Sequence, residues 1–163
     1  MSGAPAGSAV RATTMQDLPA LKGLIDTIGL FPPDLLDGMI APYLRRDFSE
    51  GFWLTCDAGG PVGVAYVGPE RMTQGTWNLY LLAVHPDRQR AGIGRALVAE
   101  VERALAMRGE RLLLVETSGV PEFAQARAFY LACGFAEEAR IRDFYQDGED
   151  KVVFRRALDL GAN

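Results

Sequence analysis

The sequence predicts one domain of the mixed α/β (α+β) class, with a mostly antiparallel sheet of about seven strands flanked by four helices. Three observations carry this prediction. The 163 residues fit one domain that buries about two-thirds of its unfolded surface. No internal repeat or low-complexity linker divides the chain. Segments with strand-like and helix-like patterns follow in the order strand, two helices, three strands, helix, strand, helix, two strands.

The first part of the chain predicts a tail, a short strand and a helix. Residues 1–9 are small and turn-forming, so we expect a flexible N-terminal tail. Residues 10–12 are expected to form the first strand. A helix is predicted over residues 13–29, because Thr14 and Asp17 have the spacing of a capping box and apolar residues follow at helical intervals.

A second helix and a hairpin follow. Residues 31–44 predict a shorter helix, with Pro33 near its start and Pro42 limiting its end. Residues 52–56 and 62–67 are rich in strand-forming side chains and flank a connector typical of a hairpin.

The central segment predicts a strand, a helix and a buried strand. Residues 76–84 form a long strand candidate in which Trp77 and Tyr80, like Tyr66 on the preceding strand, are expected in the core. A helix of about four turns follows, and Gly109 stands where its C-terminal cap is expected. Residues 111–117 have the continuous apolar character of a buried strand.

The last segments predict a short helix and two strands. Residues 122–135 resemble a helix that ends at Gly134. Strands are expected over about 135–145 and 151–158, joined by a polar turn. The domain therefore spans residues 10–158, and residues 159–163 form a C-terminal tail.

Composition narrows the function classes. The net charge is −4, with 17 basic against 21 acidic side chains, which argues against a nucleic-acid binder. The apolar stretches are too short to span a membrane, and no signal peptide is predicted at the N-terminus. Cys56 and Cys133 match no metal-ligand spacing and make no disulfide framework. A reducing cytoplasm is the expected location, and no metal site is predicted.

A turn between the central strand and its helix concentrates positive charge. It has the sequence VHPDRQRAGIGRAL, residues 84–97, with Arg88, Arg90 and Arg95 around two glycines. Unpaired amides at a helix N-terminus bind anions, and glycine allows a phosphate to approach the backbone. Arginines there could add charge-assisted bonds. The alternative is a plain strand-to-helix turn with solvated arginines, because the glycine spacing alone is a weak signal.

Three motifs together resemble the GCN5-related N-acetyltransferase (GNAT) family. The segment Gln89-Arg90-Ala91-Gly92-Ile93-Gly94 is similar to the family's acetyl-coenzyme A motif, Gln/Arg-x-x-Gly-x-Gly/Ala. Its lead-in, Ala-Val-x-Pro at residues 83–86, also matches, as does Phe-Tyr-x-x-x-Gly-Phe at residues 129–135. The order of elements resembles that fold over residues 10–158.

The resemblance implies how acetyl-coenzyme A would bind. The amides of residues 90–95 would hold the pyrophosphate, and residues 82–84 would pair with the pantetheine arm as a strand pairs with an added peptide. A bulge in that strand would let an amide near Leu82 face the thioester carbonyl. The implied cofactor-binding residues are Leu82, Ala83, Val84, Gln89, Arg90, Ala91, Gly92, Ile93, Gly94 and Arg95.

Two residues are candidates for proton transfer. An alkylammonium must lose its proton before it attacks a thioester, and Glu116 is the candidate base because it ends a buried apolar run. The structural alternative is a strand-end carboxylate paired with an arginine or capping the next segment. Tyr130 matches the family tyrosine that reaches the coenzyme A sulfur, so it is the candidate acid; otherwise it is a packed helix aromatic.

One position departs from the family pattern. Many relatives carry an asparagine seven residues before the tyrosine, and here that position is Phe123. Ser118 or Gln125 could take its place in holding the cofactor. The longer segment before Phe123 leaves the match at Glu116 open by one or two residues.

The acceptor side is expected near the second helix and the last turn. Phe31 belongs to an apolar wall, and Tyr145 lies near the end of a strand, so both are predicted to border the acceptor.

The leading hypothesis is an N-acetyltransferase that moves the acetyl group of acetyl-coenzyme A to a small amine, an amino acid or a peptide N-terminus. The alternatives are a non-catalytic acyl-coenzyme A sensor or partner subunit of the same fold, and an unrelated nucleotide-binding domain. The oligomeric state stays open, with a homodimer as one form that the resemblance allows.

Overall fold

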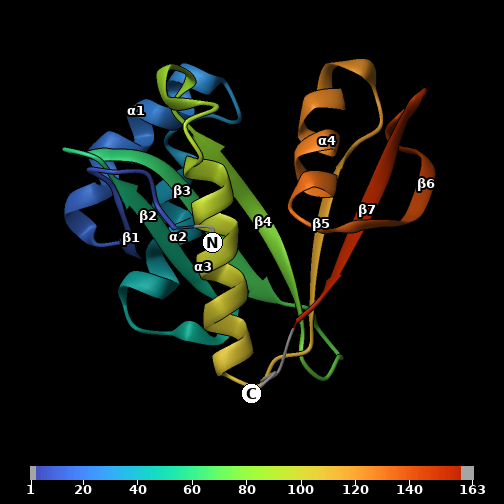
Figure 1. Cartoon of the computed structure of the whole chain (residues 1–163), viewed down its shortest axis with the longest axis horizontal. Coiled ribbons are helices and arrows are strands. Elements are labelled where there is room, and N and C mark those ends of the chain that lie inside the picture. The colour runs from blue at the N-terminus through green and yellow to red at the C-terminus, as the bar shows by residue number, and fades with distance from the viewer. Residues whose placement is uncertain (1–2, 159–163) are drawn as a thin grey trace.

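The computed structural model describes residues 3–158, which fold around one seven-stranded sheet in the order β1-β2-β3-β4-β5-β7-β6 (Figure 1). The strands are β1 Ala9–Ala12, β2 Phe52–Asp57, β3 Pro61–Pro69, β4 Thr76–Val84, β5 Leu112–Ser118, β6 Ala136–Gln146 and β7 Glu149–Ala157. Every neighbouring pair is antiparallel except β4 and β5, which run parallel. The predicted fold class is confirmed.

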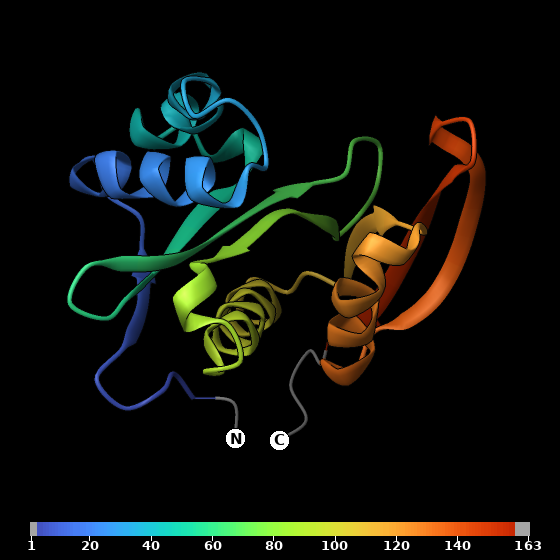
Figure 2. The same ribbon diagram turned by 90° about the horizontal axis from the view of Figure 1, so that it is seen from above.

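Four α-helices flank the sheet: α1 Leu18–Ile28, α2 Leu35–Leu44, α3 Ile93–Met107 and α4 Ala124–Ala132. Helices α1 and α2 lie on one side of the sheet and α3 on the other, as the view from above makes clear (Figure 2). Four single turns of 3-10 helix join these elements: Met15–Asp17, Phe48–Glu50, Pro86–Arg88 and Pro121–Phe123.

The predicted capping box at the start of the first helix is present. The backbone amide of Thr14 donates to Oδ2 of Asp17 at 2.8 Å, and the box closes over the 3-10 turn that precedes α1. Asp17 is 5% exposed, and Arg11 donates to both of its carboxylate oxygens at 2.7 Å. The hydrogen bond from Arg11 lowers the pKa of Asp17, so the capping carboxylate stays ionised at neutral pH.

The second helix starts later than predicted. It begins at Leu35 rather than near Phe31, and it ends at Leu44 as predicted, two residues beyond Pro42. Proline removes only one hydrogen bond, the one to the carbonyl four residues earlier. The amide of Arg45 still donates to the carbonyl of Ala41 at 3.1 Å, so the last turn closes.

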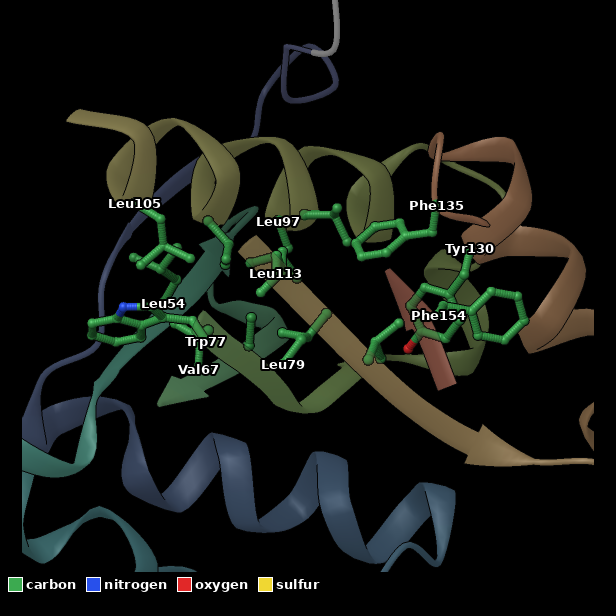
Figure 3. Close-up of a cluster of buried hydrophobic side chains, with 14 of the residues drawn as sticks. Leu54, Val67, Trp77, Leu79, Leu97, Leu105, Leu113, Tyr130, Phe135 and Phe154 are labelled. Atoms are coloured by element: carbon green, nitrogen blue, oxygen red, sulfur yellow. The ribbon is translucent and has the colours of Figure 1, made fainter. Parts of the chain in front are cut away.

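Two apolar clusters cover the two faces of the sheet. The smaller one joins α1 and α2 to the sheet through Leu21, Ile25, Trp53 and Leu81 among others. The larger one lies beneath α3 and α4 and extends from Trp77 to Phe154 (Figure 3). Because the same cluster continues from β4 across β5 to β7, it joins the two halves of the sheet.

Leu113 of β5 is fully buried in the larger cluster, so Leu113→Ala should destabilise the fold by about 2–5 kcal/mol. The free energy of unfolding in urea measures this loss. Leu131→Ala is the matched control, since Leu131 is 54% exposed and the same truncation should change stability by less than about 0.5 kcal/mol. Equal losses in the two variants would contradict the assigned core.

Candidate active site

The two central strands separate partway along their length. Residues Thr76–Leu79 of β4 pair with Leu112–Val115 of β5, and the pairing ends there. Beyond it, β5 continues alongside β7 to Ser118, while β4 continues alongside β3 to Val84. In Figure 1 the two strands lie together at their lower ends and spread apart toward the top. The last part of β4 therefore has a neighbour on one side only.

A bulge coincides with this separation. Tyr66 of β3 pairs with Leu81 and Val67 pairs with Leu79, so Tyr80 is an extra residue in β4. Tyr80 is 51% exposed, and the expectation that it lies in the core is wrong. Its ring instead lies 5.6 Å from the Tyr66 ring, where β5 no longer covers the strand.

The exposed edge of β4 offers backbone groups at Leu82 and Val84. The amide of His85 donates to the carbonyl of Val62 on β3 at 2.8 Å. Backbone groups alternate between the two sides of a strand, so those of Leu82 and Val84 point away from β3. The carbonyl of Val84 accepts from the side-chain amide of Gln89 at 3.3 Å. The cofactor roles predicted for Leu82, Ala83 and Val84 stay predictions.

The turn after β4 presents several free amides. Gly92 caps α3 with φ of 84°, and the first helical bond runs from Ala96 to the Gly92 carbonyl. Within residues 3–158, the amides of the turn that donate to no protein acceptor are those of Arg90, Gly92, Ile93, Gly94 and Arg95. They lie at the positive end of the helix dipole. This arrangement suits an anion.

The side chains of the turn leave its positive charge uncompensated. Arg88, Arg90 and Arg95 are exposed, and none forms an ion pair with a residue in the described part of the chain. His85 begins the turn, and its Nδ1 accepts from the amide of Asp87 at 3.2 Å. The histidine thus stabilises the turn.

The two glycines of the turn serve different local needs. At Gly92 the left-handed backbone disfavours any other residue, and the nearest atom to an added Cβ would be Pro5 Cγ at 3.8 Å. At Gly94 an added Cβ would lie 3.2 Å from the ring of Phe129 on α4. Gly94 therefore allows α3 and α4 to approach each other, so a substitution there would disturb packing as well as any bound anion.

Glu116 stands on β5 just past the end of its pairing with β4, and both carboxylate oxygens have partners. Its Oε1 lies 2.8 Å from Nζ of Lys151 on β7, and its Oε2 accepts from Nδ2 of Asn78 at 3.3 Å. The alternative to a catalytic Glu116 was a strand-end carboxylate paired with an arginine. Such an ion pair is present, but its cation is Lys151. The catalytic role of Glu116 stays a prediction.

Tyr130 is buried between the helix and the sheet. Its ring, 8% exposed, packs edge-on against Phe129 and Phe135, and beside Phe154 of β7 (Figure 3). Its hydroxyl donates to no acceptor within the described residues. Burial, assisted by the thiol of Cys133, raises the pKa of Tyr130 to about 12. The hydroxyl is therefore protonated and unpaired at neutral pH.

The two predicted acceptor residues lie on different elements. Tyr145 is 45% exposed on β6, and its ring meets Phe144 edge-on at 5.0 Å. Burial raises the pKa of Tyr145, and the carboxylates of Glu116 and Glu149 raise it further. Phe31 precedes α2 and packs, half-buried, against the smaller cluster. Their acceptor roles stay predictions.

Phe123, the position that departs from the family pattern, lies in a segment that is held by local hydrogen bonds. Phe123 is 43% exposed at the end of the 3-10 turn before α4. The Ser118 hydroxyl accepts from the amide of Val120 at 3.2 Å, and Arg127 donates to the carbonyls of Ser118 and Val120. Ser118 therefore has a local partner, and Gln125 has none in the described part of the chain.

Three residues near Glu116 were not predicted from the sequence: Glu70, Asn78 and Lys151. Only Asn78 gave a signal in the sequence, because it is a polar residue inside an apolar strand. In the structure Asn78 is 2% exposed. Glu70 follows β3 and accepts from Nδ2 of Asn78 at 2.8 Å. Glu70 and Lys151 approach this point only through the pairing of distant strands.

Residues 3–158 contain no group of three or more His, Cys, Asp or Glu side chains arranged to hold a metal ion. None of the helices among these residues combines the length and apolar character needed to cross a bilayer. Cys56 and Cys133 are free thiols.

Comparison with known proteins identifies the fold family. The family described as the acetyltransferase (GNAT) domain matches residues 48–137. A crystal structure of a GNAT-family acetyltransferase from Desulfovibrio desulfuricans is 34% identical, covers 93% of this chain and 99% of its own, and superimposes with a TM-score of 0.86. A structure from Salmonella typhimurium, determined with its cofactor acetyl-CoA, is 18% identical with a TM-score of 0.77, covering 96% and 97% of the two chains.

A curated relative supplies a described activity. The [ribosomal protein bS18]-alanine N-acetyltransferase of Escherichia coli K12 is 35% identical over 85 residues, which are 50% of this chain and 56% of that protein. The chain thus spans little more than half the length of this relative. The family match and the full-length likeness to the Desulfovibrio structure agree, and the chain belongs to the GNAT acetyltransferase family.

Proposed function

We propose that this protein transfers the acetyl group of acetyl-coenzyme A to a primary amine by direct attack of the amine on the thioester. One observation carries the proposal. The open edge of β4 beyond Leu79 leads directly into a turn whose amides, at Arg90 and at 92–95, have no acceptor among residues 3–158. An extended, amide-rich arm that ends in a diphosphate fits this sequence of features.

The cofactor would bind along that path. The outward backbone groups of Leu82 and Val84 would pair with the pantetheine arm, and the free amides would hold the pyrophosphate. Arg88, Arg90 and Arg95 would add charge-assisted bonds. The Salmonella structure with acetyl-CoA, which shares the fold, supports this assignment.

The acceptor amine must first lose a proton. An alkylammonium has a pKa of ~10.4, so deprotonation at pH 7 costs about 4–5 kcal/mol. Glu116 would accept this proton directly or through water. Lys151 and Asn78 hold its two oxygens, and Glu116 stands where β4 and β5 separate.

Tyr130 would assist the departing thiolate. With its pKa raised to about 12, full proton transfer to a thiolate of pKa ~8.5 would be uphill by about 5 kcal/mol. Donation of a hydrogen bond to the developing thiolate requires no such transfer. The unpaired, protonated hydroxyl suits that role.

For the acceptor we propose a peptide N-terminus or a small primary amine, bordered by Phe31 and Tyr145. The Escherichia coli relative is a ribosomal-protein alanine N-acetyltransferase. A peptide with an N-terminal alanine is therefore the first acceptor to test.

The defining experiment measures free-thiol release from acetyl-coenzyme A with a panel of such peptides, amino acids and polyamines. We expect acceptor-dependent release. Coenzyme A binding without release on any acceptor would favour the non-catalytic alternative.

Gly92→Ala should weaken coenzyme A binding at least about 10-fold, because it disturbs the amides of the turn. Gly109→Ala is the matched control, since Gly109 has a similar φ of 79° at the far end of α3. Both substitutions force alanine into the left-handed region, which costs roughly 1–2 kcal/mol of stability. Calorimetric titration with coenzyme A measures the difference. Equal affinities in the two variants would remove the turn from the binding site.

Tyr130→Phe should lower kcat by roughly 10- to 100-fold, as loss of a hydrogen bond to a charged group predicts, and leave coenzyme A affinity within about twofold. Steady-state kinetics and calorimetry on the same preparation separate the two effects. Phe129→Leu is a packing control on the same helix. An unchanged kcat in Tyr130→Phe would remove the hydroxyl from the mechanism.

The raised pKa of Tyr130 predicts an alkaline loss of stability. Because folding raises this pKa from 10.0 to about 12, the contribution of Tyr130 to the free energy of unfolding is complete below pH 10. It is lost as the pH rises toward 12. Relative to Tyr130→Phe, the wild type should therefore lose about 1 kcal/mol of unfolding free energy between pH 8 and pH 11. Urea denaturation at both pH values measures it; a constant difference would contradict the burial argument.

A further inference from the structure

Asn78 is a buried polar residue at the place where the sheet opens. It lies on β4 opposite Leu114 of β5, one residue before the last paired position, and only 2% of its surface is exposed. Its side-chain amide donates to two carboxylates, at 2.8 Å to Oε1 of Glu70 and at 3.3 Å to Oε2 of Glu116. One amide therefore joins the end of β3 to the carboxylate on β5.

Chemistry fixes which way this amide faces. Ionised carboxylates only accept hydrogen bonds, so Asn78 must direct its NH₂ group, rather than its oxygen, toward both glutamates. The same group carries two hydrogens, one for each partner. A flipped amide would place its oxygen against two anions.

Glu70 is itself held in place by the turn between β3 and β4. Its backbone amide donates to the Thr76 carbonyl at 2.8 Å, and its own carbonyl accepts from the Thr73 hydroxyl at 2.9 Å. The Tyr80 hydroxyl donates to the same Oε1 at 3.4 Å. Glu70 can thus orient the Asn78 amide.

Lys151 holds Glu116 from the opposite side. Its Nζ lies 2.8 Å from Oε1 of Glu116 and 4.0 Å from the centroid of the Phe144 ring. Lysine is a flexible, point-like cation. Without Asn78, nothing else in the described residues would bond to Oε2, and the carboxylate would follow the lysine.

We propose that Asn78, oriented by Glu70, is a positioning residue that holds the Glu116 carboxylate where β4 and β5 separate. The inference rests on the proposed function, in which Glu116 takes the proton of the acceptor amine. Asn78 and Glu70 themselves touch no reacting atom. The hydrogen bond from Asn78 holds Oε2 of Glu116 toward β4, while Oε1 is paired with Lys151.

The first test replaces the amide with an apolar side chain of similar size. Asn78→Leu should lower kcat about 10-fold, as loss of a hydrogen bond to a charged group predicts, and leave coenzyme A affinity within about twofold. Thr76→Val is the matched control, because Thr76 is 9% exposed on the same strand and its hydroxyl donates to no acceptor within residues 3–158. We expect no change in kcat for Thr76→Val.

A double-mutant cycle separates positioning from a structural effect. In the Glu116→Gln background, Asn78→Leu should change the residual kcat by less than about twofold, because the residue through which it acts is already altered. An undiminished 10-fold loss in that background would overturn the proposal.

Two variants of Glu70 test the second step without touching the buried asparagine. Glu70→Gln retains an oxygen that accepts from Asn78, whereas Glu70→Met does not. We expect kcat to fall several-fold in Glu70→Met and to stay within about twofold in Glu70→Gln. An equal fall in both would show that the charge of Glu70 matters rather than its contact with Asn78, and would overturn its orienting role.

These outcomes are distinct from a failure of the proposed function. If the wild type releases no thiol from acetyl-coenzyme A with any acceptor, the proposed function fails before the variants are compared. If the wild type is active and Glu116→Gln lowers kcat, the cycle decides on Asn78 alone. If Asn78→Leu proves too unstable to assay, Glu70→Met and Glu70→Gln still decide, because Glu70 is only half-buried.

Discussion

The short parallel pairing of β4 with β5 is the constraint on which the rest of this structure depends. Four positions pair, from Thr76 to Leu79, and the strands then diverge. Backbone groups in a sheet need partners, so a strand that leaves its neighbour exposes an edge that another molecule can complete. The bulge at Tyr80 increases the twist at the same point. The edge at Leu82 and Val84 and the position of Glu116 both follow from this divergence.

The opened sheet stays one domain because its apolar clusters continue across the gap. The larger cluster joins β4, β5 and β7 beneath α3 and α4, with Leu113 at its centre. Tyr130 is part of this cluster, and the burial that fixes its ring also raises the pKa of its hydroxyl to about 12. Packing and chemistry are therefore coupled at this residue. Gly94 has a similar double role, because it belongs to the turn and its lack of a side chain leaves room for the Phe129 ring.

Charge is arranged oppositely at the two ends of the open edge. The turn after β4 carries three exposed arginines and free amides in a chain of net charge −4. The base of the opening carries Glu70 and Glu116, with Lys151 as the one cation paired to either of them in the described residues. An anionic group bound at the turn would lie near positive charge, and an ammonium group bound near the two glutamates would lie near negative charge. A single amide, that of Asn78, joins the two glutamates across the strands.

The sequence by itself determined most of the helices and strands, the glycine-containing turn before α3 and the family resemblance, because these depend on local patterns. Apolar periodicity, the Thr14–Asp17 box and the left-handed glycines at 92, 109 and 134 all act within a few residues. The start of the second helix differs from the prediction, at Leu35 rather than near Phe31, whereas its end at Leu44 is as predicted. Tertiary structure alone decided where β4 leaves β5, why Tyr80 is exposed, and that Glu70, Asn78 and Lys151 surround Glu116. Those contacts join four separate segments, and strand register, which sets them, is fixed by packing across the whole sheet.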